Sequence, residues 1–163
     1  ALFNEFSNEL FGVCLYYSGN REDAEDALHE GFLKIFDKIK GFKGSGSFRG
    51  WIRKVMVNTV LEKHRKRNYL YAVKSEIKEK GEEFRDGISE DLNSRDLVHL
   101  IQQLSPQYRM VFNLYAIEGY SHKEIAKLLG ISVGTSKSNL ARARSILQKK
   151  VKKFFYTPVK KVE

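Results

Sequence analysis

The strongest constraint on the fold is a pair of short helical patterns, joined at Gly130, within residues 121–149. Ser121 and Glu124 have the spacing of a capping box, in which each side chain accepts a hydrogen bond from the backbone N–H of the other residue. Gly130 permits a sharp turn, and Ser132 is placed to cap the helix that follows. Spacings of three and four predict that one seam of this second helix packs against its partner helix. The seam comprises Val133, Ser136, Leu140, Ala143 and Leu147.

The outer face of this second helix is polar and basic. Helical spacing places Thr135, Ser138, Asn139 and Arg142 largely on that face, from which side chains reach phosphates and base edges. A basic helix that follows a tight turn is typical of a DNA-binding helix-turn-helix. The alternative is an ordinary helical hairpin whose basic side chains are merely solvated.

The rest of the chain is also predicted to be folded and mainly helical. Its 163 residues include only two prolines, and 12% are aromatic. No apolar run reaches the ~20 residues of a membrane-spanning helix, and no signal peptide is visible. Cys14 is the only cysteine, which excludes an internal disulfide and a cysteine-based metal cluster, and its apolar neighbours indicate a core position. We therefore expect a cytoplasmic protein without membrane insertion.

Charge is divided into blocks along the chain, and this division is more informative than the net charge of +9. Residues 1–33 carry one basic and seven acidic side chains, whereas residues 34–67 carry eleven basic and two acidic ones. Residues 68–96 carry five basic and eight acidic side chains, and residues 97–163 carry twelve and three. Two separate basic blocks predict two contacts with a polyanion such as nucleic acid.

Three helices are expected in the first part of the chain, and together they predict a small helical bundle. The first covers about 3–18, and the second runs from an N-cap at Asn20 to about residue 39. A glycine-rich loop, KGFKGSGS, precedes a third helix over 48–67 that is capped by Ser47. The apolar residues predicted to bury one face of the second helix are Ala24, Ala27, Leu28, Phe32, Ile35, Phe36 and Ile39.

The second part is predicted to be a four-helix domain. Weak apolar spacing in residues 68–92 predicts a flexible linker with at most partial helix. A helix over 94–103 follows, then a helix that begins at Ser105-Pro106, runs to about Ile117 and ends at Gly119. The expected all-α chain therefore has a first helical domain (1–67), a linker (68–92), a helix-turn-helix domain (93–155) and a basic tail (156–163).

These segments together resemble a known family. The strings REDAEDALHEGFLKIFDKIKGFKG and SFRGWIRKVMVNTVLEKHRKR, then a linker, then LSPQYRMVFNLYAIEGYSHKEIAKLLGISVGTSKSNLARAR, are similar in order and spacing to bacterial sigma-70 factors. The form with only the second and fourth conserved regions is the extracytoplasmic-function (ECF) group. The resemblance covers nearly the whole chain. It implies a promoter-specificity subunit that binds core RNA polymerase, recognises two promoter elements and helps to melt the DNA, without enzymatic activity of its own and without a cofactor.

The resemblance assigns polymerase binding to the acidic helix at 21–39. In the family, this helix contacts the coiled-coil clamp helices of the large RNA polymerase subunit. Phe32 and Ile35 are expected to pack inward, and a purely solubilising acidic face is the alternative. His29 departs from the glutamine that is common at its position. The implied polymerase-binding residues are Asp23, Glu25, Asp26 and Glu30.

The glycine-rich loop and the third helix resemble the part of the family that opens promoter DNA at the minus-ten element. An unstacked base needs an aromatic and basic rim, and Phe42 is the candidate for it, with a role in the bundle core as the alternative. Asn58 stands where the family places a base-contacting asparagine. The candidate DNA contacts in this domain are Phe42, Lys43, Arg49, Arg53, Lys54, Asn58, Arg65 and Arg67.

The helix from about residue 133 is implied to enter the major groove of the minus-thirty-five element. Ser136 replaces the branched apolar residue usual in the family, and Asn139 stands where arginine is frequent. We therefore expect weaker core packing around Ser136, and we expect Asn139 to change which promoter sequence is preferred. The candidate contacts are His122, Lys123, Thr135, Lys137, Ser138, Asn139, Arg142 and Arg144, of which the first two are expected to touch the DNA backbone.

Core RNA polymerase, promoter DNA and an anti-sigma protein are the partners that the resemblance implies. A conventional helix-turn-helix activator or repressor is the alternative, but it leaves the basic block at 40–67 and the glycine loop without a purpose. A nucleic-acid-modifying enzyme is disfavoured, because the sequence contains no phosphate-binding glycine loop, no Ser-His-Asp pattern and no metal-ligand spacing.

Overall fold

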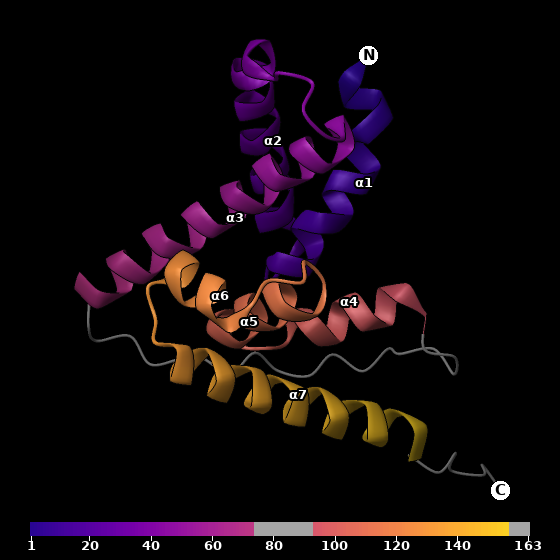
Figure 1. Cartoon of the computed structure of the whole chain (residues 1–163). Helices are drawn as coiled ribbons and strands as arrows, with labels where there is room; N and C mark the ends of the chain where they lie inside the picture. Colours follow the sequence, from indigo (N-terminus) through magenta and orange to yellow (C-terminus); the bar gives the residue numbers. More distant parts are fainter. Residues whose placement is uncertain (74–92, 157–163) are drawn as a thin grey trace, which may run out of the picture. The chain divides into compact units, whose positions relative to one another are not determined.

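The protein is all-α, as the sequence predicts. The computed structural model describes residues 1–73 and 93–156, and within these residues it contains helices and no strand (Figure 1). The elements are α1 (Leu2–Tyr17), α2 (Arg21–Lys38), the 3-10 helix η1 (Ile39–Gly41), α3 (Phe48–Val73), α4 (Ser94–Gln102), α5 (Pro106–Ala116), α6 (His122–Leu129) and α7 (Val133–Tyr156).

Helices α1, α2 and α3 form a bundle in which each helix packs against the other two. Gly31 of α2 allows a close approach to α3, because any side chain at this position would collide with the Met56 side chain. Cys14 is fully buried, and its burial raises the pKa of the thiol to about 12, so it is an unreactive core residue, as predicted. The largest fully buried side chains of this bundle are Tyr17, Leu10, Ile35, Ile52, Met56 and Leu61.

Helix α2 begins as its sequence indicates. The Asn20 side chain accepts a hydrogen bond of 2.8 Å from the backbone N–H of Asp23, which satisfies one of the free amides of the first turn. Phe32 and Ile35 are buried, as predicted, but the prediction for Phe36 is wrong, since this residue is 49% exposed. Residues four apart advance by slightly more than one turn, so the row of residues that starts at Leu28 has rotated out of the core by Phe36.

Helix α3 is longer than predicted. Ser47 caps it as expected, accepting a hydrogen bond from the backbone N–H of Gly50 at 3.3 Å. The helix then continues without interruption to Val73, so residues 68–73 of the predicted linker are helical. Residues 74–92 of that linker, and residues 157–163 of the predicted tail, lie outside the described residues.

The caps of the second part were predictable from local sequence. Pro106 opens α5 after Ser105, as expected. Ser121 and Glu124 form the predicted capping box, with distances of 2.7 Å from the Ser121 amide to the Glu124 carboxylate and 3.3 Å from the Glu124 amide to the Ser121 hydroxyl. Gly130 adopts a φ of 68° in the turn between α6 and α7, a conformation that favours glycine.

Helix α7 packs mainly against α5 rather than against the preceding helix α6. The two helices of a helix-turn-helix cross at a steep angle, so few of their residues approach each other and the long helix finds its neighbour elsewhere. Four of the five predicted seam residues are buried, whereas Val133 at the start of α7 is half-buried. No helix in the described ranges is long and apolar enough to cross a membrane.

Candidate nucleic-acid interface

Three of the four acidic side chains of α2 that are predicted to bind polymerase are ion-paired. The Arg67 guanidinium of α3 donates to the Asp23 carboxylate at 2.6 Å, and Glu25 pairs with Arg21 at 2.8 Å. Asp26, by contrast, is exposed and has no ion pair among the residues described. The predicted acidic face therefore exists, but its members are not equally free to bind a partner.

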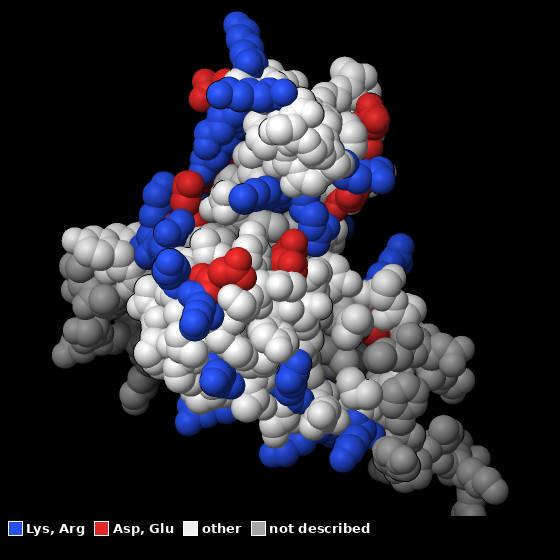
Figure 2. All heavy atoms as spheres, in the orientation of Figure 1, with Lys and Arg blue, Asp and Glu red and all other residues white. Residues whose placement is uncertain are grey.

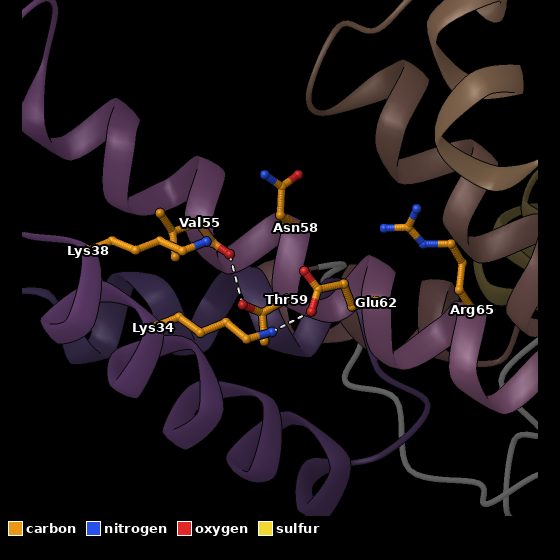
Figure 3. A pocket seen from close by; sticks show the side chains of 7 residues that line it. All are labelled: Lys34, Lys38, Val55, Asn58, Thr59, Glu62 and Arg65. Atoms are coloured by element: carbon orange, nitrogen blue, oxygen red, sulfur yellow. Dashed lines mark hydrogen bonds and ion pairs between the residues drawn. The ribbon is translucent and has the colours of Figure 1, made fainter. Parts of the chain in front are cut away.

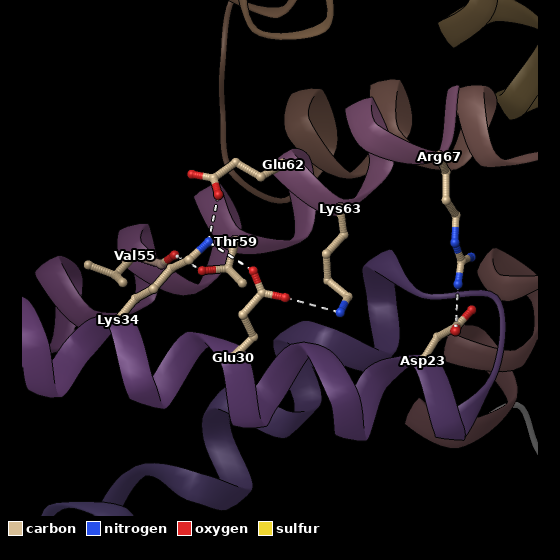
Figure 4. A network of polar contacts seen from close by, with 8 residues as sticks. All are labelled: Asp23, Glu30, Lys34, Val55, Thr59, Glu62, Lys63 and Arg67. Carbon is tan, nitrogen blue, oxygen red and sulfur yellow. Dashed lines mark hydrogen bonds and ion pairs between the residues drawn. The ribbon is translucent and has the colours of Figure 1, made fainter. Parts of the chain in front are cut away.

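Glu30 is the centre of a charge network between α2 and α3 (Figure 4). Its carboxylate accepts from Lys34 at 3.0 Å and from Lys63 at 3.1 Å, and Lys34 also donates to Glu62 at 2.6 Å. Burial raises the pKa of Glu30, but the hydrogen bonds from Lys34 and Lys63 outweigh burial and hold the pKa below its usual range. Glu30 therefore links the two helices in addition to any role at the surface.

Phe42 belongs to an aromatic cluster at the start of α3. Its ring centroid lies 5.4 Å from that of Phe48 and 5.3 Å from that of Trp51, and all three side chains are half-buried. This position combines the two roles considered for Phe42, because the ring covers the end of the bundle while one part stays open to solvent. Lys43 is exposed beside it.

The basic side chains predicted on the third helix lie mainly at the surface of α3. In Figure 2, Lys and Arg gather along the edge of the bundle formed by α2 and α3, whereas α1 carries acidic atoms. Lys54, Asn58 and Arg65 are exposed, and Arg53 is half-buried. Arg49 is exposed but held, since it pairs with Glu9 at 3.1 Å and lies over the Phe6 ring. The structure therefore confirms a basic surface on this helix, part of which is engaged by acidic neighbours.

Helix α7 presents the predicted polar face of the helix-turn-helix, with one exception. Lys137, Ser138, Arg142 and Arg144 are exposed, as are Thr135 on the same helix and Lys123 on α6. The predicted outer-face position of Asn139 is wrong, because this residue is only 6% exposed. Asn139 follows the buried Ser136 by three residues and precedes the buried Ala143 by four, so it lies at the edge of the buried seam rather than on the outer face.

His122 is half-buried and takes part in a contact that the sequence did not predict. Its Nδ1 lies 2.9 Å from the hydroxyl of Ser136, whose side chain is fully buried in α7. The imidazole also stacks on Tyr115 of α5, with ring centroids 4.7 Å apart. The serine in the apolar seam therefore has a polar partner, and its hydroxyl is not left unsatisfied.

An exposed apolar surface on the first bundle was also missed. Leu33 is 70% exposed and Phe36 is 49% exposed, and Phe3 of α1 contacts Phe32 with ring centroids 4.7 Å apart. The exposure of Leu33 was predictable from helical spacing, because Leu33 follows the buried Phe32 by one residue and lies outside the buried face of α2. Large apolar side chains at the surface beside acidic ones are common where another protein binds.

Comparison with known protein families accounts for both parts of the molecule. Residues 2–69 match the family model for sigma-70 region 2, and residues 94–147 match the model for sigma-70 region 4. The two models together cover most of the chain, in the order that the sequence predicted. The chain belongs to the sigma-70 family of RNA polymerase sigma factors. Members of this family are transcription initiation factors and not enzymes, in agreement with the prediction from the sequence.

Relatives of this sigma factor have ECF names. The ECF RNA polymerase sigma factor SigE of Mycolicibacterium smegmatis is 27% identical over 157 residues, which cover 90% of this chain and 59% of the relative. The ECF RNA polymerase sigma factor SigW of Bacillus subtilis is 28% identical over 161 residues, which cover 90% of this chain and 85% of the relative. These similarities place the chain in the ECF group, although it spans less than two thirds of the mycobacterial protein.

A solved structure has the same fold. The sigma factor RpoE of Bartonella quintana, crystallised with the anti-sigma factor NepR, matches 92% of this chain and 94% of its own length, with a TM-score of 0.56 and 22% identity.

Within the described ranges of our sigma factor, no group of His, Cys, Asp and Glu side chains is arranged to hold a metal ion.

Proposed function

We propose that this ECF sigma factor binds core RNA polymerase, recognises the minus-ten and minus-thirty-five elements of promoter DNA and helps to melt the duplex in the cytoplasm. One observation carries the proposal: a basic helix with an aromatic cluster at its start and a complete helix-turn-helix occur in one chain. A conventional activator or repressor needs only the second of these, and the region 2 match at residues 2–69 disfavours it.

The two parts of the chain divide this work. Residues 1–67 hold the polymerase-binding and minus-ten functions, residues 93–155 hold the minus-thirty-five function, and 68–92 and 156–163 serve as linker and basic tail. Among the acidic residues, the exposed Asp26 is the most available for polymerase, with Glu25, Asp23 and Glu30 more strongly engaged inside the protein. The neighbouring Leu33 and Phe36 supply the apolar part of that surface.

For the minus-ten element, the exposed part of Phe42 serves as a stacking surface for an unpaired base, with Lys43 beside it. Asn58 is the candidate for a base edge, and Arg53, Lys54, Arg65 and Arg67 serve as backbone contacts. Arg49 completes this set, although its ion pair with Glu9 must loosen before it reaches a phosphate.

For the minus-thirty-five element, Arg142 is the candidate for reading a guanine edge, because arginine matches this base with two hydrogen bonds. Within the described part of the chain, its guanidinium makes only a long contact of 3.4 Å with the Tyr108 hydroxyl, which leaves it available for DNA. Contacts to phosphates are proposed for Lys123, Thr135, Lys137, Ser138 and Arg144. Buried Asn139 and half-buried His122 are proposed to act by holding the helices in place.

An anti-sigma protein is the further partner that we propose. The exposed apolar side chains Leu33 and Phe36 support it, since an apolar surface of this kind is a site at which another protein binds when polymerase is absent. The crystallised sigma factor of Bartonella quintana, which is in complex with an anti-sigma factor, is an example of such a partner.

The direct test is reconstituted transcription. The purified chain is mixed with core RNA polymerase and a library of promoter fragments, and specific RNA starts are mapped. We expect defined starts that depend on the added chain and on both promoter elements. A chain that binds DNA alone but gives no initiation with core polymerase would establish the activator or repressor reading instead.

A further inference from the structure

A small pocket lies between α2 and α3 on the basic edge of the first bundle (Figure 3). Its volume is about 260 Å³, which is below the range typical of sites that enclose a drug-sized ligand. Three cations and one carboxylate dominate its wall. The lining residues are Lys34, Lys38, Val55, Asn58, Thr59, Glu62 and Arg65.

Three donors around this pocket are unused. Lys38, Asn58 and Arg65 are exposed and make no hydrogen bond or ion pair with any residue of the described ranges. The Thr59 hydroxyl is already engaged, because it donates to the Val55 carbonyl at 2.9 Å. The pocket therefore offers the two positive charges of Lys38 and Arg65 to an incoming anion, while the Asn58 amide at its wall keeps the base-reading role proposed above.

A nucleobase is a poor match for this pocket. Bases bind to proteins mainly by stacking on aromatic rings, and no aromatic side chain lines the wall, so that Arg65 is the one lining residue with a plane for stacking. Val55 is the only apolar residue there, and it is 9% exposed. The aromatic cluster of Phe42 and Trp51 is not part of the lining. The chemistry of the pocket therefore fits a small oxyanion rather than a flat ring.

The third cation of the pocket, Lys34, is already occupied. Its ammonium group lies 2.6 Å from Glu62 and 3.0 Å from Glu30. Burial lowers the pKa of Lys34, but hydrogen bonds to Glu62 and Glu30 outweigh burial and raise it, so Lys34 is charged at neutral pH. Glu62 is the more exposed of the two acceptors, with 43% of its side chain accessible to solvent against 33% for Glu30.

We propose that this pocket binds one backbone phosphate of nucleic acid, and that Glu62 competes with that phosphate for Lys34. A phosphate that enters between Lys38 and Arg65 repels the Glu62 carboxylate and attracts the Lys34 ammonium group. Lys34 stays paired with Glu30 throughout, so the exchange leaves no buried charge uncompensated. Glu62 thus limits the affinity of the chain for DNA. This inference rests on the proposed DNA-binding function.

The test is a salt titration of promoter binding by the holoenzyme reconstituted from the full chain and core polymerase. We compare the parent chain with Glu62→Gln, Lys38→Ala and the control Glu5→Gln. The control removes one exposed carboxylate of α1 that has no ion pair within the described residues and does not line the pocket, so its change in net charge equals that of Glu62→Gln. Circular dichroism confirms that each variant is folded.

Glu62→Gln is expected to tighten binding several-fold on specific and unrelated DNA alike, and to steepen the dependence of log affinity on log salt by about one unit. Lys38→Ala is expected to weaken binding to all sequences and to reduce the slope by about one unit. Adding Lys34→Ala to Glu62→Gln should remove the gain, because the gain acts through the freed lysine.

Three outcomes overturn the phosphate site: Glu62→Gln binds as Glu5→Gln does, its effect depends on the base sequence, or the gain survives the loss of Lys34. Failure of the proposed sigma function has a different signature, since the parent chain would then give no initiation with core polymerase. In that event the same salt titrations with the free chain and DNA still decide whether the pocket holds a phosphate.

Discussion

The Nδ1 atom of His122, at the start of α6, lies 2.9 Å from the hydroxyl of Ser136, which is buried in α7. The same imidazole stacks on Tyr115 of α5, and the guanidinium of Arg144 lies 5.4 Å from the centre of the Tyr115 ring. His122 therefore touches α7, the helix that carries the predicted DNA contacts, and α5, the helix on which α7 packs. A polar pair here replaces the apolar contact that the family resemblance led us to expect.

Ser136→Ala should lower the free energy of unfolding by about 1 kcal/mol, because it removes a buried hydrogen bond and leaves the imidazole nitrogen without its partner. Urea denaturation followed by circular dichroism measures this change. Ser145→Ala is the matched control, since Ser145 is an exposed serine of the same helix. Equal effects of the two substitutions would mean that the contact with His122 contributes nothing.

Asn139→Ala and Arg142→Ala should have opposite signatures. Asn139 is buried, so its loss should reduce stability and leave the order of preferred promoter sequences unchanged. Arg142 is exposed, so its loss should leave stability unchanged and cost about 1–3 kcal/mol at one base pair. Binding to a set of single-base promoter variants separates the two. A uniform loss across that set would reassign Arg142 to a phosphate.

Charge reversal should likewise separate Asp26 from Glu30. Asp26→Lys should weaken the binding of core polymerase without a change in melting temperature, because Asp26 is exposed and unpaired among the described residues. Glu30→Lys should lower the melting temperature as well, because it places a third cation beside Lys34 and Lys63. Binding to immobilised core polymerase and thermal denaturation measure the two effects. Unchanged affinity of Asp26→Lys would remove Asp26 from the interface.

Asp23 should make stability depend on pH in the acid range. The hydrogen bond from Arg67 lowers the pKa of Asp23 in the folded protein, against the opposing effect of burial. Its stabilisation is therefore complete above the unfolded pKa of about 3.9 and is lost as pH falls through the lower, folded pKa. The difference in unfolding free energy between the parent chain and Asp23→Asn should shrink over that interval. Asp37→Asn, at an exposed carboxylate without an ion pair in the described ranges, is the control.

Local chemistry explains which features were predictable from sequence. The Asn20 cap and the Ser121–Glu124 capping box depend on residues three apart, so the order of residue types was enough. Asn139 lies at the border between the seam and the outer face of α7, where helical spacing alone does not decide burial, and it was misplaced for that reason. The pairs that join α2 and α3, such as Lys34 with Glu62, also needed the packed bundle to become visible.

Because α3 is unbroken, it fixes the distance between the proposed promoter contacts of the first domain. At about 1.5 Å per residue, Phe48 and Arg67 are separated by about 29 Å along the helix axis. B-form DNA rises about 3.4 Å per base pair, so this length corresponds to about eight base pairs. In the proposed complex with DNA, the aromatic cluster at one end of α3 and the arginines at the other therefore contact positions no further apart than this interval, apart from the reach of their side chains.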